Sequence, residues 1–276
     1  MQDDSSVLIG SSTKVVSSNK DLQRLTTLSG QFRRRPQAYD GVPGTGELKF
    51  IAFLVSTAGP GRDDRVIDVA CGTGALTQAF AERSGSAVGL DIMAPALVQA
   101  RTQARERGLT NAEFTLGELE RMPFDDGQFT GAACRFSFHH FVNPARVFAE
   151  MARVIAPHGW MVIADMTASE ELAKAALHNE LERLADPTHS RTLAASEFDT
   201  LFAANGFRTV MKIDRDARTT LDEWIGFNHT PPEAAARIRE LMEASVDGDS
   251  AGLRAVRDRD TIRTIRTSTT FVIERE

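Results

Sequence analysis

The chain has 276 residues, of which 42% are hydrophobic and 25% charged, as in ordinary globular proteins, and this excludes a disordered, collagen-like or coiled-coil chain. The 32 Lys and Arg against 38 Asp and Glu give a formal net charge of -6, so no general attraction to nucleic acid or to an anionic membrane is expected. The start lacks an apolar leader, and no run of about 18 apolar residues occurs. With only Cys71 and Cys134 as thiols, we expect reduced cysteines and a cytoplasmic protein without a membrane span.

Residues 1–18 are rich in Ser, Thr and Asp, a composition that predicts a flexible tail, and residues 19–276 are expected to form one domain. Between residues 21 and 55 the apolar spacing is helical but interrupted at Pro36, which predicts a helical preface to the domain.

From residue 65 onward, short β-branched segments alternate with helical patterns. Strands are expected at 66–70, 87–91, 112–116, 131–136 and 160–164, with helices at 75–83, 94–107 and 144–155. Repeated units of this kind predict a mostly parallel sheet with helices on both faces, because each crossover must pack back on the sheet with one hand.

After residue 165 the pattern is mainly helical and returns twice to a strand. Helices are expected at 170–185, 196–204, 221–227 and 232–246, and strands at 209–213 and 267–273. Arg259, Arg263 and Arg266 have the spacing of one helix stripe, so a basic helix with salt bridges to Asp258 and Asp260 is expected before the last strand.

These helical stretches predict a cap rather than a second domain, since each returns to a strand. The cap would cover about 166–204 and 220–265, on a core of about 60–165 and 205–276.

A glycine turn follows the first expected strand, in the stretch Cys71-Gly72-Thr73-Gly74. Glycines let a ligand approach the backbone, although any turn that needs positive φ gives the same signal. Asp91 ends the next strand, where a carboxylate can accept hydrogen bonds from both ribose hydroxyls of a nucleoside. Thr77 replaces the third glycine of nicotinamide binders, and Asp68 would repel a pyrophosphate but attract a cation. The turn therefore indicates a nucleoside ligand that is not a dinucleotide.

With these residues, the stretch from Gln31 to Asp165 resembles the class I S-adenosylmethionine-dependent methyltransferases, and within them the quinone-biosynthesis methyltransferases. Asp68 to Gly74 is similar to their first motif, with Ala70 in place of its first glycine. The resemblance implies that Asp68 and the turn residues Gly72 and Gly74 seat the methionine part of the cofactor.

The same resemblance implies where the nucleoside binds. Asp91 is similar to the acidic ribose clamp, and the apolar Ile92 and Met93 would flank the adenine. Glu118 and Leu119 belong to a stretch similar to the third motif, in which a carboxylate accepts a hydrogen bond from the adenine amino group. Glu118 is one methylene longer than the aspartate that the family often has.

The stretch from Cys134 to Phe141 is similar to the fourth motif. Arg135 could anchor the cofactor carboxylate or a substrate acid, or form a structural ion pair. His139 and His140 are adjacent and make a poor metal pair, so no metal site is expected. One of them could act as a general base, or both could shape the pocket.

Upstream, Tyr39 is the only tyrosine of the chain. Its hydroxyl could reach the methionine end of the cofactor or line the methyl-transfer channel, or its ring could hold the preface helix on the sheet.

The resemblance implies a Rossmann-like, seven-stranded, mostly parallel α/β sheet with helices on both faces, an N-terminal helical preface and a helical cap insertion. It implies methyl transfer from S-adenosylmethionine to an O, C or N atom of a small, partly apolar metabolite by metal-independent in-line displacement, with S-adenosylhomocysteine as product. A non-methylating reaction in the same pocket and a cofactor-binding regulatory module are the alternatives, ahead of a nicotinamide oxidoreductase. A monomer or homodimer without nucleic-acid or membrane partners is expected.

Overall fold

The computed structural model describes residues 45–276, and side chains from residue 47 onward. The expected tail over residues 1–18 lies outside this part. The strands are β1 (Arg65–Val69), β2 (Ser86–Asp91), β3 (Ala112–Leu116), β4 (Phe129–Arg135), β5 (Ile155–Met166), β6 (Phe207–Thr220), β7 (Val256–Asp258) and β8 (Thr261–Arg275). The helices are α3 (Thr45–Ala58), α4 (Ala75–Ala81), α5 (Ala94–Glu106), the short 3-10 helix η1 (Phe138–His140), α6 (Pro144–Val154), α7 (Leu172–Ala185), α8 (Ala195–Ala203), α9 (Leu221–Phe227) and α10 (Pro232–Ser245).

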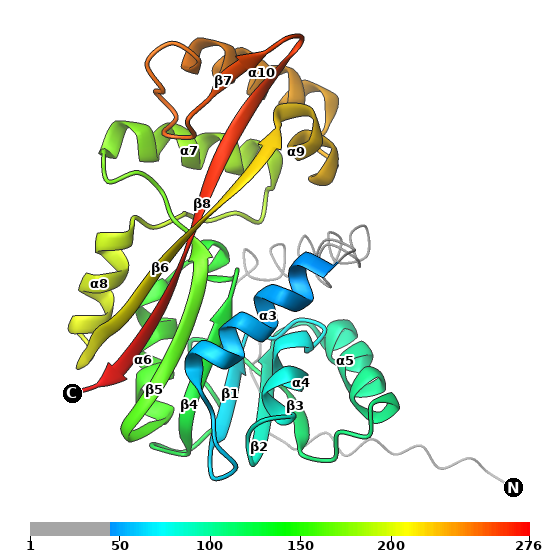
Figure 1. Cartoon of the computed structure of the whole chain (residues 1–276), viewed down its shortest axis with the longest axis vertical. Helices are drawn as coiled ribbons and strands as arrows, with labels where there is room; N and C mark the ends of the chain where they lie inside the picture. Colours follow the sequence, from blue (N-terminus) through cyan, green and yellow to red (C-terminus); the bar gives the residue numbers. More distant parts are fainter. Residues whose placement is uncertain (1–44) are drawn as a thin grey trace, which may run out of the picture.

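One sheet holds all the described strands, in the order β3-β2-β1-β4-β5-β8-β6, with β7 paired to β8 off this path (Figure 1). The neighbours from β3 to β5 are parallel, and β8 is antiparallel to both β5 and β6. The expected Rossmann-like, mostly parallel sheet is confirmed, with seven strands along the path and the short β7 as an eighth.

Two hydrophobic clusters show why these segments form a sheet covered on both faces. Along β1, Ile67 and Val69 belong to one cluster and Val66 to the other, the alternation of a strand buried on both sides. The first cluster includes apolar side chains of α6 and α8, and the second those of α3 and α4. Figure 1 shows α3 crossing one face of the sheet, with α6 and α8 behind it.

The strands β6 and β8 are much longer than expected and run beyond the rest of the sheet as a twisted ribbon (Figure 1). Around their far ends lie α7, α9, α10 and β7, which share a third hydrophobic cluster. Its side chains include Leu181, Trp224, Ile238 and Met242. These elements, called the cap region below, therefore have apolar packing of their own and are joined to the sheet by two continuous strands. α8, which the sequence placed in the cap, packs on the sheet instead.

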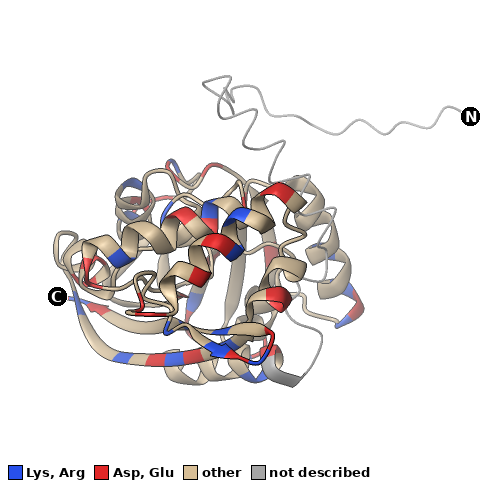
Figure 2. Cartoon of the chain, turned by 90° about the horizontal axis from the view of Figure 1, so that it is seen from above, with Lys and Arg blue, Asp and Glu red and all other residues tan. Residues whose placement is uncertain are grey.

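The expected basic helix was wrong. Arg263 and Arg266 lie on β8, and Asp258 ends β7, the strand that pairs with it. Charges of both signs alternate along the ribbon (Figure 2), and ion pairs such as Arg254 to Asp216 and Arg263 to Asp258 join them. A charged outer edge of this kind discourages pairing with another strand.

None of the helices in residues 45–276 is long and apolar enough to cross a membrane.

Candidate functional site

The charged residues singled out in the sequence gather at the carboxyl ends of the parallel strands. Asp68 lies on β1, Asp91 ends β2 and Arg135 ends β4. β1 lies between β2 and β4, at the point where the strand order reverses. Ligands of open α/β sheets bind outside the strand ends at this point, because the loops on either side diverge there.

The turn between β1 and α4 has the left-handed backbone that its glycines suggest. Gly72 has φ 55° and Gly74, the N-cap of α4, has φ 80°. A Cβ at Gly74 would lie 2.5 Å from the Phe114 ring, whereas one at Gly72 would meet no atom of residues 45–276 within 4 Å. Gly74 is thus needed for packing, and Gly72 leaves its backbone open to a ligand. Ala70, in place of the usual glycine, also has a left-handed φ of 60°.

Asp91 ties this turn to β2. Its Oδ2 accepts a hydrogen bond from the Gly72 amide at 2.8 Å, and its Oδ1 accepts one from the Met93 amide, also at 2.8 Å. Burial raises the pKa of Asp91 and these amides lower it, with a net rise. A carboxylate has about four acceptor positions, so both oxygens retain capacity for ribose hydroxyls.

Asp68 is fully buried beside Thr77, whose hydroxyl donates to its Oδ2 at 2.6 Å. Burial raises the pKa of Asp68 to about 7, against the opposing effects of the Thr77 hydrogen bond and the Arg135 cation. A cationic ligand at the strand ends would favour its ionised form. In the sequence, Thr77 indicates only that the ligand is not a dinucleotide, and the hydrogen bond from Thr77 to Asp68 was not predicted.

Arg135 forms an ion pair with Glu47 of α3, at 2.6 Å between Nη1 and Oε1. Both side chains are largely buried, and Arg135 also lies against the Phe136 ring. The structure therefore supplies a partner for the structural ion-pair alternative. Glu47 could not be found from the sequence, because nothing in the local pattern of α3 indicates what its first turn contacts.

The loop after β3 lies beside β2, since the Gly117 amide donates to the Asp91 carbonyl at 3.1 Å. Glu118 is half-buried there, and Leu119 packs into the cluster on the α6 side of the sheet. Ile92 is half-buried against the same cluster and against Met93. The expected adenine contacts are thus brought near one another, with Leu119 mostly occupied by core packing.

The two adjacent histidines have different surroundings. The Nδ1 atom of His139 lies 2.6 Å from Oδ1 of Asp165, at the end of β5. Burial alone would lower the pKa of His139, but the Asp165 carboxylate raises it overall, and the pKa of Asp165 is lowered in return. His140 instead places Nδ1 3.2 Å from the Thr188 carbonyl, and burial with His139 beside it lowers its pKa to about 3. The pairing with Asp165 was missed in the sequence.

Within residues 45–276, no group of three or more His, Cys, Asp or Glu side chains could hold a metal ion. Tyr39 lies outside the described residues.

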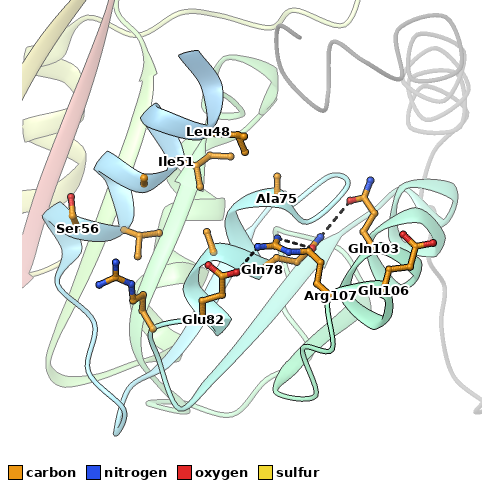
Figure 3. Close-up of a pocket in the computed structure, with 13 residues that line it drawn as sticks. Leu48, Ile51, Ser56, Ala75, Gln78, Glu82, Gln103, Glu106 and Arg107 are labelled. Atoms are coloured by element: carbon orange, nitrogen blue, oxygen red, sulfur yellow. Dashed lines mark hydrogen bonds and ion pairs between the residues drawn. The ribbon is translucent and has the colours of Figure 1, made fainter. Parts of the chain in front are cut away.

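A surface groove of about 560 Å³ lies elsewhere, between α3, α4 and α5 (Figure 3). Arg107 crosses its floor, with hydrogen bonds to Gln78 at 3.0 Å and Glu82 at 2.5 Å. None of the site residues predicted from the sequence lines this groove.

A family described as "Methyltransferase domain" matches residues 60–211, more than half of the chain. The chain belongs to this family. It is a class I methyltransferase that uses S-adenosylmethionine as its cofactor.

Two relatives illustrate the range of similarity. This methyltransferase is 28% identical to the uncharacterized methyltransferase YcgJ of Bacillus subtilis over 75% of its own length and 82% of that protein. It is 37% identical to a demethylmenaquinone methyltransferase of Thermus thermophilus, over only 36% of its own length and 46% of that enzyme.

Solved structures agree in fold. The YcgJ crystal structure has a TM-score of 0.76 at 25% identity, covering 82% of this methyltransferase and 97% of that chain. A crystal structure from Bacillus halodurans has a TM-score of 0.77 at 24% identity with the same coverage.

Proposed function

We propose that this methyltransferase moves the methyl group of S-adenosylmethionine to an O, C or N atom of a small, partly apolar metabolite without using a metal ion. The observation that carries the proposal is the pair of buried carboxylates, Asp68 and Asp91, on either side of a glycine turn that is open to a ligand at Gly72. Two acidic groups suit a cationic nucleoside better than a pyrophosphate.

The turn fits such a cofactor, because a Cβ at Gly72 would contact none of the residues that the structure describes, and a ligand can approach its backbone. Asp68 would face the cationic methionine end, and Asp91 would accept hydrogen bonds from the ribose hydroxyls. The residues proposed to bind the cofactor are Asp68, Ala70, Gly72, Gly74, Asp91, Ile92, Met93, Glu118, Leu119 and Arg135. Through its ion pair with Glu47, Arg135 would hold α3 over the strand ends as well as add a positive charge there.

S-adenosylmethionine supplies a methyl group that is already activated by its sulfonium, so the chain's own contribution is mainly positional. It must hold the acceptor atom about 3 Å from the methyl carbon, in line with the breaking bond. The cap region around α7, α9 and α10 would exclude water and select the acceptor. His139, His140 and Tyr39 are the proposed catalytic residues, and the first two lie on η1, directly after β4.

A small, partly apolar acceptor is supported by the demethylmenaquinone methyltransferase of Thermus thermophilus, whose name describes methylation of a quinone precursor. The net charge of -6 also gives no general attraction for nucleic acid.

Calorimetric titration with S-adenosylmethionine, S-adenosylhomocysteine and NADH tests the cofactor site. Both adenosyl ligands are expected to bind with micromolar dissociation constants, about -8 kcal/mol, and NADH is not. Asp91→Ala should weaken adenosyl binding tenfold or more, about 1.4 kcal/mol.

Asp63→Ala is the matched control, because Asp63 is exposed and precedes β1 at the opposite edge of the sheet. Its affinities should equal those of the wild type. Asp91→Asn, which keeps one oxygen acceptor, should lie between the two. Binding of NADH in place of the adenosyl ligands would overturn the proposal.

A further inference from the structure

Asp165 is held as an anion at the end of β5. It has no exposed surface, and three groups point hydrogen-bonding atoms at its oxygens. The Phe138 amide donates to Oδ2 at 2.6 Å, the Met166 amide donates to Oδ1 at 2.7 Å, and His139 Nδ1 lies 2.6 Å from Oδ1. Such bonds to a buried carboxylate keep it ionised, because they favour the charged form.

This arrangement fixes the imidazole of His139. Its Nδ1 bonds to Asp165, and its backbone carbonyl accepts hydrogen bonds from the Ser190 and Arg191 amides at 2.8 and 3.1 Å. The ring of His189 stacks on it at 5.5 Å between centroids. With an anion at Nδ1, the neutral ring carries its proton there, so Nε2 has a free lone pair.

The Nε2 atom of His139 makes no hydrogen bond to any residue from 45 to 276. The short helix η1 that carries it lies at the carboxyl end of the parallel strands, as the proposed cofactor site does. η1 directly follows β4, which is hydrogen-bonded to β1, the strand of Asp68. Cys134, the residue before the end of β4, is within electrostatic range of both Asp165 and Asp68, which raise its pKa after burial.

Other titratable groups around His139 are already engaged. His140 has its Nδ1 at the Thr188 carbonyl, and the Nε2 of His189 lies 3.0 Å from the Asn179 amide oxygen. Burial lowers the pKa of His189 to about 4, so this ring stays neutral beside His139. Glu182 of α7 and Asp186, just after it, act on His139 at longer range and favour its protonated form.

We propose that His139 is the general base of this methyltransferase, that Asp165 is its positioning residue, and that the acceptor is a small molecule with an acidic O–H or activated C–H. The inference rests on the proposed methyl transfer. In the reaction the acceptor's O–H or C–H bond breaks and its proton passes to His139 Nε2. The electron pair left on oxygen or carbon forms the new bond to the methyl carbon. The bond between methyl carbon and sulfonium sulfur breaks with its electron pair kept by sulfur, and the histidine proton then passes to water.

The acceptor class follows from what a base is needed for. Amines and thioethers with an available lone pair need no proton removed before attack, so a buried and oriented base would give them no advantage. A weakly acidic hydroxyl or an enolisable carbon is a poor nucleophile until its proton leaves, and removal by a positioned base contributes a factor of about 10² to 10⁴.

The acceptor class is tested with S-adenosylmethionine carrying a deuterated methyl group. The whole protein is incubated with this cofactor and a small-molecule extract, and labelled products are identified by mass spectrometry. Label on oxygen or on carbon is expected, and the fragment masses distinguish the two. Label on an amine or a sulfur would overturn the acceptor class. So would an extract in which no O–H or C–H compound gains label although the cofactor binds.

The base is tested with the labelled acceptor and the variants His139→Gln and Asp165→Asn. His139→Gln should lower kcat about 100-fold or more with little change in KM, and the fall in rate on the acidic side should disappear. Asp165→Asn should lower kcat more than tenfold. It should also move the acidic fall in rate to lower pH, because losing the anion lowers the pKa of His139.

His158→Asn is the control, since His158 is exposed near the start of β5, at the opposite edge of the sheet. Its left-handed φ of 63° suits asparagine, and its rate should equal that of the wild type. A His139→Gln variant with wild-type kcat would overturn the base.

A measurement without cofactor or acceptor tests the geometry itself. Nitrogen-15 spectra of the histidine side chains should show His139, assigned by the signal lost in His139→Gln, as the Nδ1–H tautomer. It should titrate above the usual histidine range, and Asp165→Asn should bring that titration down. A His139 ring protonated at Nε2 in the neutral form would overturn the proposal. Loss of adenosyl binding in the wild type would instead count against the proposed function.

Discussion

Ala70 occupies a left-handed position that the related motif gives to glycine. Its φ of 60° places the Cβ against the following carbonyl, at a cost of about 1 to 2 kcal/mol. Ala70→Gly removes this strain, and it loses one partly buried methyl and adds backbone entropy to the unfolded chain. We expect a net gain of about 0.5 kcal/mol in the free energy of unfolding, measured by urea denaturation.

Ala79→Gly is the matched control for this substitution, because Ala79 lies inside α4 with ordinary helical backbone. Glycine there should lower the free energy of unfolding by about 0.5 to 1 kcal/mol. The two variants thus differ in sign, and a loss of stability at position 70 would contradict the strain.

Asp68 makes stability depend on pH in a defined direction. Its folded pKa, about 7, lies above the value of 3.8 expected when unfolded, so the folded chain binds the extra proton between these pH values. The contribution of the protonated Asp68 carboxyl to the free energy of unfolding is fully present below pH 3.8 and is lost as pH rises through about 7. Asp68→Asn removes the titration, so its stability relative to the wild type should grow by up to roughly 4 kcal/mol from pH 4 to pH 8.

Urea unfolding at each pH measures this difference. Asp63→Asn, an exposed change in the loop before β1, is measured alongside as the control. A difference between Asp68→Asn and wild type that stays constant from pH 4 to pH 8 would contradict the raised pKa of Asp68.

Site residues that belong to a sequence motif could be predicted, whereas residues that join the site through a contact made only in the folded chain could not. Asp68, Gly72, Gly74 and Asp91 follow one another at strand ends, so a linear pattern shows them. Asp165 was not predicted as a site residue, because its bond to His139 joins β5 to η1, which are brought together only by the pairing of β4 with β5.

At the scale of elements, the two glycines of the turn have different roles: Gly74 is required for packing, and Gly72 leaves the backbone accessible to a ligand. Gly74→Ala would force a Cβ to within 2.5 Å of the Phe114 ring at a φ of 80°, and overpacking with strain should cost about 3 kcal/mol of stability. In the described part of the chain the new methyl of Gly72→Ala meets no atom within 4 Å, so the expected cost in stability comes from its φ of 55° and is about 1 kcal/mol.

The affinity for adenosyl ligands should show the opposite order, with a larger loss in Gly72→Ala than in Gly74→Ala. A methyl at position 72 would project where the cofactor is proposed to lie, so Gly72→Ala should weaken calorimetric binding more than tenfold while the protein stays folded. Equal binding by Gly72→Ala and wild type would move the cofactor away from this turn.

The elements from β1 to α6 were predicted to within a few residues, because each has one clear period of apolar residues. The segment before the last strand was not. Ile262 and Ile265 are three apart, as on a helix, yet in the first part of β8 the buried residues are Ile262, Thr264 and Arg266. Polar side chains on the buried face hide the period of two. The buried charge of Arg266 is compensated there, because its Nε lies 3.1 Å from Oε1 of Glu182 and its guanidinium lies over the Trp224 ring.

At the scale of the whole molecule, the ribbon of β6 and β8 decides whether the cap and the sheet can unfold separately. Both strands contribute to the sheet at one end and pack with α9 at the other, and the buried Arg266 to Glu182 ion pair fastens α7 to the ribbon. If the cap region unfolded alone, Arg266 would stay on the paired strands without its partner Glu182, and an uncompensated buried charge costs free energy. The apolar side chains of the cap cluster that lie on the ribbon would also become exposed to water. We therefore expect one cooperative transition.

The chain offers a direct measurement, because its only two tryptophans lie on either side of the junction: Trp160 on β5 and Trp224 on α9. Trp160→Phe leaves a fluorophore in the cap, and Trp224→Phe leaves one in the sheet. Each change lowers stability, so the test is made within each variant. The urea midpoint from its single tryptophan should coincide with the midpoint from far-ultraviolet circular dichroism, which reports the whole chain. A cap tryptophan whose midpoint falls below that of the dichroism would show that the ribbon lets the cap open first, and cap opening would then be a step available to substrate entry.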